Sequence, residues 1–278
     1  MKFQNPKKPA SEPGRIFLLA VCAAFTFLGA PNAVAQSGEV DRFSVSLGIF
    51  LTDRDSQTRI DGDIPDSGTD VDLENDFGFD TSDLVFRIDG YYRFNEKHRL
   101  DFSVFDLSRT ASKQIQEDIE WDGTIYPIDT VVDASLDLQI YKLAYTWSFL
   151  NRDKGYLGVS AGVYVADIGT ALAAESIGRS SSGGVTAPLP VLGLRGQYEF
   201  SQKWSFRGSA EIFAFEYGDY SGSLYDIYAG VDYQIFEHTA IGIGFNRVSL
   251  DVGVSKTNFN GDLDWRYQGG LLFLKFDF

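Results

Sequence analysis

Residues 262–278 of the chain read DLDWRYQGGLLFLKFDF, and this stretch decides the fold. Its alternate positions from Gly270 to Phe278 are Gly, Leu or Phe, whereas the positions between them end in Lys275 and Asp277. Successive side chains of a β-strand point to opposite faces, so the stretch is predicted to be a strand with one apolar face and one face that turns polar towards its end. A strand that ends in this way needs a partner on both edges, because an open edge is a template for aggregation.

Pairing of the last strand with the first would supply that partner and close a barrel. The ending, with Phe276 and Phe278 two positions apart, resembles the C-terminal signature of bacterial outer-membrane β-barrel proteins, in which a terminal aromatic residue and alternating apolar residues are recognised by the barrel assembly machinery. The resemblance covers the N-terminal segment and essentially all of residues 41–278. It implies a location in the outer membrane, contact with its lipid and lipopolysaccharide, and Phe276 and Phe278 as the assembly signal. It carries no catalytic residues.

Residues 1–35 are predicted to be a cleaved secretory signal peptide. A basic region contains Lys2, Lys7, Lys8 and Arg15. An apolar run, 16–30, follows it, and Ala33-Val34-Ala35 is an A-x-A cleavage site. The run is short for a membrane-spanning helix. The single cysteine, Cys22, lies inside this segment, so the exported barrel, residues 36–278, would have neither a disulfide nor a thiol nucleophile.

From Asp41 onward the sequence predicts strands at a steady spacing and no helix of useful length. About ten strands are expected, near residues 42–52, 83–94, 99–110, 135–149, 156–166, 187–200, 204–217, 223–235, 240–252 and 263–278. Most are long enough to cross a bilayer when tilted. The predicted fold class is therefore all-β, a closed antiparallel up-and-down transmembrane β-barrel of about ten strands.

The connections between these strands alternate in length. Short polar connections are expected at 95–98, 151–154, 201–203 and 237–239. The other connections are 53–82, 111–134, 167–186, a brief 218–222, and 253–262. Outer-membrane barrels have short periplasmic turns and longer extracellular loops, so the first set is assigned to the periplasm and the second to the outside.

A soluble ligand-carrier barrel would show the same alternation, with its apolar faces turned inward. The signal segment, the terminal Phe and the aromatic residues near the short turns favour the membrane barrel, because Trp and Tyr collect at membrane interfaces. The girdle at the turns would contain Phe94, Trp147, Phe149, Tyr198, Phe200, Trp204, Phe276 and Phe278. The girdle at the loops would contain Phe50, Tyr217, Tyr225, Trp265 and Tyr267.

The inward faces of the strands carry basic and acidic residues in balance, which predicts a network of ion pairs across the lumen. Its expected members are Arg87, Asp89, Arg93, Arg99, Asp101, Lys142, Arg195, Glu199, Arg207, Glu211, Asp226, Asp232, Lys275 and Asp277. One interpretation is that these residues fill a narrow barrel, and the other is a constriction that selects small polar solutes. Because so few strands leave little free lumen compared with a porin, we expect little or no conductance.

The formal charge of −15 is concentrated in two expected loops, near 53–82 and 111–134. This acidity argues against nucleic acid as a partner. Oxygen-rich loops can hold a divalent cation, and Asp53, Asp55, Asp61 and Asp63 are the candidate ligands. An EF-hand pattern fails, since Thr58 stands where it requires Gly. The charge serves either to keep the loops solvated or to bind lipopolysaccharide phosphates through divalent ions, and no other cofactor is expected.

Catalysis has little support in the residues. Outer-membrane enzymes, including the omptin proteases with the same number of strands, generally rely on a histidine. The two histidines, His98 and His238, fall in expected periplasmic turns, away from the outer rim. We therefore expect a non-enzymatic outer-membrane barrel that acts through its acidic loops in envelope integrity or surface binding. The alternatives are a narrow channel or transporter for small or hydrophobic solutes, and a lipid-modifying enzyme.

Pro188 and Pro190 stand where the sixth strand is expected to begin, and neither can donate to a ladder. They mark either the end of a loop and the start of a strand, or a lateral gap through which a lipid tail enters.

Overall fold

The computed structural model describes residues 41–60, 68–121, 123–217, 220–256 and 259–278. These residues form a closed antiparallel barrel of 10 strands, which confirms the predicted fold class. The predicted signal peptide lies outside the described residues. Among the residues that are described, no helix is both long enough and apolar enough to cross a membrane.

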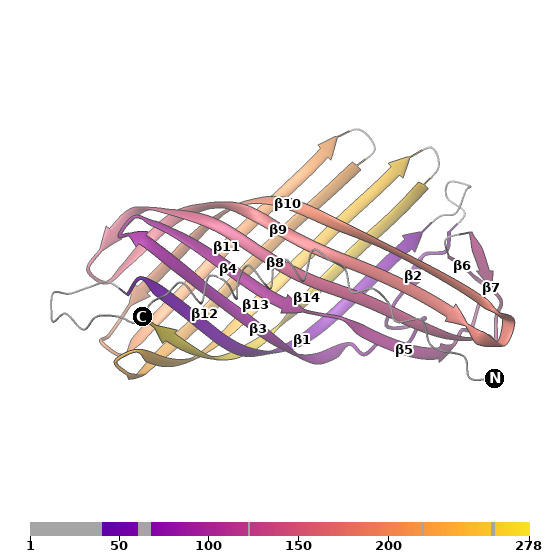
Figure 1. The fold of residues 1–278 in the computed structure, drawn as a ribbon, viewed down its shortest axis with the longest axis horizontal. Coiled ribbons are helices and arrows are strands. Elements are labelled where there is room, and N and C mark those ends of the chain that lie inside the picture. Colours follow the sequence, from indigo (N-terminus) through magenta and orange to yellow (C-terminus); the bar gives the residue numbers. More distant parts are fainter. Residues whose placement is uncertain (1–40, 61–67, 122, 218–219, 257–258) are drawn as a thin grey trace, which may run out of the picture. The chain divides into compact units, whose positions relative to one another are not determined.

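Each strand of the wall pairs with its neighbours in chain order (Figure 1). The wall consists of β1 (Phe43–Ile60), β3 (Ser82–Asn95), β4 (His98–Asp106) continued by β5 (Arg109–Gln114), β8 (Val131–Arg152), β9 (Gly155–Ala174), β10 (Arg179–Glu199), β11 (Trp204–Tyr217), β12 (Tyr220–Phe236), β13 (Thr239–Lys256) and β14 (Phe259–Asp277). Three short strands accompany them: β2 (Val71–Asp72), which pairs with β1, and β6 (Ile119–Trp121), which pairs with β7 (Thr124–Tyr126).

The barrel is closed by a long ladder between β1 and β14, which runs from Ser44↔Asp277 to Ile60↔Gly261. The terminal residue takes part in this closure. The Phe278 N–H donates to the carbonyl oxygen of Phe43 at 2.8 Å, and the Arg42 N–H donates to the carbonyl oxygen of Phe278 at 2.8 Å. The C-terminal strand is thus paired on both edges, with β1 and with β13.

Short turns lie at one end of the barrel, here called the turn end, and the longer connections at the other, the loop end. The four expected short turns are present between β3 and β4, β8 and β9, β10 and β11, and β12 and β13. At the loop end, only the connections that follow β1 and β5 are long. The prediction of long loops at 167–186 and 253–262 is wrong. The first range is mostly taken up by the ladder between β9 and β10, and the second by the ladder between β13 and β14.

A 3₁₀ turn at Glu175–Ile177 joins β9 to β10. The two acidic ranges also contain more strand than expected, since 53–60 belongs to β1, 111–114 to β5 and 131–134 to β8. Apart from Val131, these extensions carry polar residues on their outward faces, so they lack the apolar alternation that reveals a strand facing lipid.

The outward faces of the strands form an apolar belt. On β1 it consists of Leu47, Ile49 and Leu51, which are 40–61% exposed. Outward polar residues end the belt at the loop end: Asp53, Asp106, Asp137, Asp167, Glu216 and Arg247. At the turn end an aromatic girdle is present, with exposed Phe94, Trp147, Phe149, Tyr198, Phe200, Trp204 and Phe278. A continuous apolar surface of this size is normal only where lipid covers it.

The prediction of an aromatic girdle at the loop end is largely wrong. Phe50, Trp265 and Tyr267 are buried and face the interior, whereas Tyr225 does face outward, and the side chain of Tyr217 lies outside the described residues. On β13 the ladder runs through Asn246 and Arg247 without a bulge.

Val248 and Leu250, which follow on β13, are buried inside the barrel. The inward face of the wall therefore changes from polar to apolar towards the loop end.

The close approach at the closing ladder gives a test. A Cβ added at Gly269 would lie 1.8 Å from the carbonyl oxygen of Leu51, whereas at Gly270 nothing lies within 4 Å. We expect Gly269→Ala to destabilise the barrel by about 1–3 kcal/mol, the cost of overpacking, and Gly270→Ala to have little effect. The measurement is the temperature at which heat-modifiable migration on a gel is lost. Equal melting of the two variants would contradict the closure geometry.

Candidate functional site

The interior of the barrel has two layers, a charged layer towards the turn end and an apolar layer towards the loop end. Inward positions of the first layer alternate between large charged residues and small ones such as Gly158, Ser160 and Gly162 on β9. This alternation lets long side chains cross a narrow lumen.

At the centre of the charged layer, Lys142 on β8 holds two carboxylates. Its Nζ lies 2.9 Å from Asp226 Oδ2 on β12 and also contacts Glu211 on β11. All three side chains are at most 7% exposed. A buried charge is tolerated only when it is paired in this way.

From Glu211 the contacts continue across the lumen to β4. Arg195 on β10 pairs with Glu211 and lies 3.7 Å from Asp101. Asp101 in turn pairs with Arg99 at 2.8 Å and accepts a hydrogen bond from the Thr146 hydroxyl at 2.6 Å.

From Asp226 the contacts continue in the other direction to β3. Asn246 on β13 donates to Asp226 Oδ1 at 2.6 Å, and it accepts a hydrogen bond from Arg87 Nη1 at 2.6 Å. Arg87 also pairs with Asp89 at 2.9 Å.

The residues Arg99, Asp101, Arg195, Glu211, Lys142, Asp226, Asn246, Arg87 and Asp89 therefore form one connected set, here called the charge network. Its cations, Arg87, Arg99, Lys142 and Arg195, equal its carboxylates in number, so the network is formally neutral.

The other expected members of the lumen network lie closer to the turn end. Arg207 pairs with Asp232 at 2.7 Å, and Lys275 pairs with Asp277 at 2.9 Å. The guanidinium of Arg93 lies 5.4 Å from the ring of Tyr91. Glu199, which was expected in the network, is exposed at the turn end.

Outside the spanning strands, burial and the nearby Asp277 carboxylate raise the pKa of Asp41.

The cavity within the charged layer is small. It has a volume of about 90 Å³ and is lined by Arg87, Asp101, Lys142, Arg195, Arg207 and Asp226, among other residues. A cavity measured in this way needs roughly 10–15 Å³ to hold one water molecule, so this space suits several waters.

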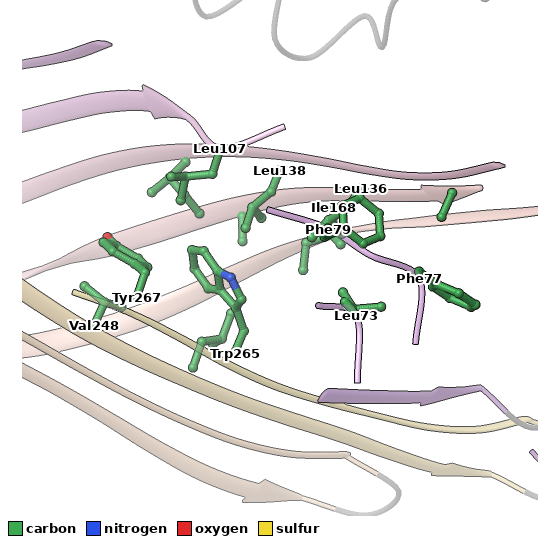
Figure 2. Close-up of a cluster of buried hydrophobic side chains, with 14 of the residues drawn as sticks. Leu73, Phe77, Phe79, Leu107, Leu136, Leu138, Ile168, Val248, Trp265 and Tyr267 are labelled. Carbon is green, nitrogen blue, oxygen red and sulfur yellow. The ribbon is translucent and has the colours of Figure 1, made fainter. Parts of the chain in front are cut away.

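The apolar layer is completed by the segment 71–79, which folds into the barrel between β1 and β3 and is here called the plug. Its side chains Leu73, Phe77 and Phe79 are at most 4% exposed and belong to the same buried cluster as Leu136 and Ile168 of the wall (Figure 2). The inward aromatic residues of β14, Trp265 and Tyr267, belong to that cluster as well (Figure 2).

Polar contacts fix the plug in place. Glu74 pairs with the buried Arg109 on β5, and its other oxygen accepts the Ser56 N–H at 3.0 Å. Arg109 also donates to the Ser56 hydroxyl at 2.6 Å and lies 5.1 Å from the ring of Phe79. A loop carboxylate and a wall guanidinium thus neutralise each other where the plug meets β1.

The second long connection adds apolar residues beside the plug. Trp121 packs against Phe77 with ring centroids 5.8 Å apart. Tyr126 is fully buried, and its hydroxyl donates to the carbonyl oxygen of Leu172 at 3.2 Å. The sequence interpretation treated both connections as solvated acidic loops and missed this packing.

The remaining candidates do not form a site among the described residues. Asp53 and Asp55 are exposed on the outward face of β1, while Asp61 and Asp63 lie outside the described residues. The described part of the chain contains no group of three or more His, Cys, Asp and Glu residues that could hold a metal. The ring of His98 stacks on Tyr145 at 5.8 Å at the turn end, and His238 lies in a turn at the same end.

Comparison with solved structures agrees with this architecture. The outer membrane protease OmpT from Escherichia coli matches with a TM-score of 0.53 and 14% sequence identity, over 87% of this chain and 100% of that chain. The fold is that of a bacterial outer-membrane β-barrel.

Two further similar structures have lower scores. The translocator domain of the autotransporter NalP from Neisseria meningitidis has a TM-score of 0.46 at 12% identity, over 96% of each chain. The attachment invasion locus protein Ail of Yersinia pestis has a TM-score of 0.36 at 10% identity, over 84% of this chain and 99% of that chain. No protein-family model and no curated protein sequence matches the chain. At these identities the likeness shows the fold alone.

The charge network predicts an asymmetric response to mutation. Lys142→Met leaves Glu211 and Asp226 buried without their shared cation, so we expect it to lower the free energy of unfolding in lipid vesicles by about 3–5 kcal/mol. The matched control is Lys97→Met in an exposed turn, where we expect a change within about 0.5 kcal/mol. Urea titration of the folded barrel measures both, and equal stability of the two variants would contradict the role given to Lys142.

Proposed function

We propose that the chain is a non-enzymatic outer-membrane barrel with a blocked lumen, which acts in envelope integrity or surface binding through its acidic loop end. The observation that carries the proposal is the filled interior. The charge network crosses one half of the lumen, and the plug with its surrounding apolar side chains fills the other half.

The outer membrane is supported as the location by the apolar belt, the aromatic girdle and the fold shared with OmpT. The turn end then faces the periplasm and the loop end faces outward, as in other barrels of this kind. This orientation places both chain ends of the described barrel, Asp41 and Phe278, on the periplasmic side.

Surface binding is supported by the charge at the loop end. Exposed acids there are Asp53, Asp55, Asp70, Asp80, Glu117, Asp118, Asp129 and Asp133. Carboxylates held on an outward rim attract divalent cations, which also bind phosphates. The proposed partner is therefore the phosphate region of lipopolysaccharide, reached through divalent ions.

The absence of enzymatic activity remains part of the proposal. Both histidines of the sequence lie at the turn end, far along the strands from the acidic rim. OmpT is named as a protease, but at 14% identity the likeness to it extends to the fold alone.

The second candidate function is transport of small or hydrophobic solutes. It is favoured by the apolar character of the interior towards the loop end. Passage along the lumen would require both the plug and the charge network to rearrange.

A blocked lumen predicts negligible ion flow. We expect the purified barrel to give no steady conductance in planar bilayers, because the charge network and the plug occupy its narrow lumen. A wide porin inserted into the same bilayers serves as the positive control. Large steady single-channel currents would contradict the blocked lumen and favour the channel alternative.

The proposed partner predicts a lipid-dependent effect of chelation. We expect EDTA to lower the melting temperature of the barrel in vesicles that contain lipopolysaccharide and to leave it unchanged in vesicles of phospholipid alone. The variant Asp53→Asn/Asp55→Asn should reduce the difference. If chelation has the same effect in both kinds of vesicle, the acidic rim serves solubility only.

A further inference from the structure

The wall of the barrel is incomplete between β10 and β11. β10 pairs with β9 along nearly its whole length, from Arg179↔Ala174 to Tyr198↔Gly155. Within the described residues, however, its ladder with β11 covers only Leu192↔Ile212 to Glu199↔Ser205. β11 itself continues beyond Ile212, paired with β12. Pro188–Val191 of β10 and Phe213–Ala214 of β11 therefore border a gap, here called the lateral opening.

The opening arises because the β9–β10 hairpin leans away from β11. In Figure 1, β9 and β10 run on to the right of the view, whereas the β11–β12 hairpin ends at the top. Contacts with the β6–β7 hairpin hold β9 and β10 in that position. The Tyr126 hydroxyl donates to the carbonyl oxygen of Leu172, and Arg179 donates to the carbonyl oxygen of Ile125.

Two prolines lie on the edge of β10 that borders the opening. The ladder with β9 continues across both of them, as Pro188↔Val165 and Pro190↔Val163. An unbroken ladder is expected where the proline nitrogens face the opposite edge of the strand, because proline has no N–H to donate. The same edge then presents two fewer unsatisfied donors to an apolar surrounding, where each would be costly.

The position of these prolines rules out one of the two interpretations of the sequence. β10 begins at Arg179, well before Pro188, so the prolines lie inside the strand and do not mark its start.

The opening lies at the depth of the apolar belt. Towards the turn end, the opening stops at the last β10–β11 pair, Leu192↔Ile212. The side chains of this pair are 65% and 66% exposed and face outward. On β11 the belt ends at the outward Glu216. The opening thus begins within the belt and reaches its border at the loop end.

The inside of the opening is apolar. Leu189 and Val191 on β10 are buried and face inward, and the buried Leu224 on β12 is the ladder partner of Phe213. Phe213 packs against the same apolar cluster. The charge network begins one inward position deeper, at Glu211, so a guest in the opening would meet hydrocarbon side chains and no charge.

We propose that the lateral opening admits an acyl chain of a membrane lipid from the outer leaflet. An acyl chain needs no hydrogen bonds, so it can lie beside Leu189, Val191 and Phe213 without leaving a buried polar group of its own unsatisfied. Lipid is the occupant because the opening faces the belt, where acyl chains surround the barrel. The inference rests on the outer-membrane location in the proposed function, and it requires neither the blocked lumen nor the acidic rim.

Fluorescence quenching tests the proposal. All four native tryptophans, Trp121, Trp147, Trp204 and Trp265, are replaced by Phe, and Phe213→Trp is then introduced as the reporter. The barrel is folded into vesicles of phosphatidylcholine with brominated acyl chains, which quench tryptophan only at close range. Heat-modifiable migration on a gel shows that each variant is folded.

The matched control is Phe50→Trp in the same background. Phe50 also faces inward, and it precedes the belt-ending Asp53 by the same distance along the strand as Phe213 precedes Glu216. It lies behind an intact wall, since β1 pairs with β3 and β14 at this residue. Both reporters therefore stand at the same depth and differ in the wall beside them.

We expect brominated lipid to quench the reporter at 213 severalfold more than the reporter at 50. Leu189→Trp, on the other border of the opening, should give the same result and replaces the first reporter if that variant does not fold. Equal quenching at the opening and at residue 50 would overturn the proposal. Quenching by brominated free fatty acid but not by brominated lipid would also overturn it, and would assign the opening to a soluble guest. Conductance is not part of this readout, so failure here leaves the blocked lumen standing.

Discussion

Backbone hydrogen bonding is the constraint on which the rest of this structure depends. A polar backbone group without a partner costs several kcal/mol in hydrocarbon, so a sheet that crosses a membrane has to close on itself. The ladder between β1 and β14 provides that closure, and the Phe278 N–H and carbonyl oxygen both take part in it. Once the sheet is closed, each strand must present one face to lipid and the other to a narrow interior.

The two halves of the interior are filled by different segments of the chain. Towards the turn end, the wall alone supplies side chains, and the charge network pairs every cation with a carboxylate so that the layer is formally neutral. Towards the loop end, the strands extend beyond the belt and enclose the space that receives segment 71–79. The plug enters that space and buries Phe77 and Phe79, while Arg109 compensates the charge of Glu74.

The opening between β10 and β11 is the exception to closure, and the same constraint explains its composition. Packing of the loop-end hairpins against one another draws β9 and β10 away from β11. Where the ladder is lost, Pro188 and Pro190 have no N–H to leave unsatisfied. The two prolines therefore lower the cost of an incomplete wall at this place.

The barrel and its strand order were determined by the sequence itself, because a strand with one face outward and the other towards a packed lumen must alternate with a period of two. Residues such as Leu84, Phe86, Val85 and Arg87 show that alternation directly, and the structure places the first pair outward and the second inward. The charged residues of the lumen could be assigned to inward positions for the same reason. Their partners could not, since Arg99, Arg195 and Lys142 come from strands distant in sequence.

Only the tertiary structure decided what the acidic loops do. Val71, Leu73, Phe77 and Phe79 are apolar residues spaced among acids, so the acidic composition of this segment concealed them. They form a buried face only because the interior of the barrel at the loop end accommodates them. Trp265 and Tyr267 were misassigned to the lipid surface, because alternation tells which residues share a face and not which face is inside. The lateral opening depends on the directions of the β9–β10 and β11–β12 hairpins. Contacts between segments distant in sequence set these directions, and no local sequence pattern predicts such contacts.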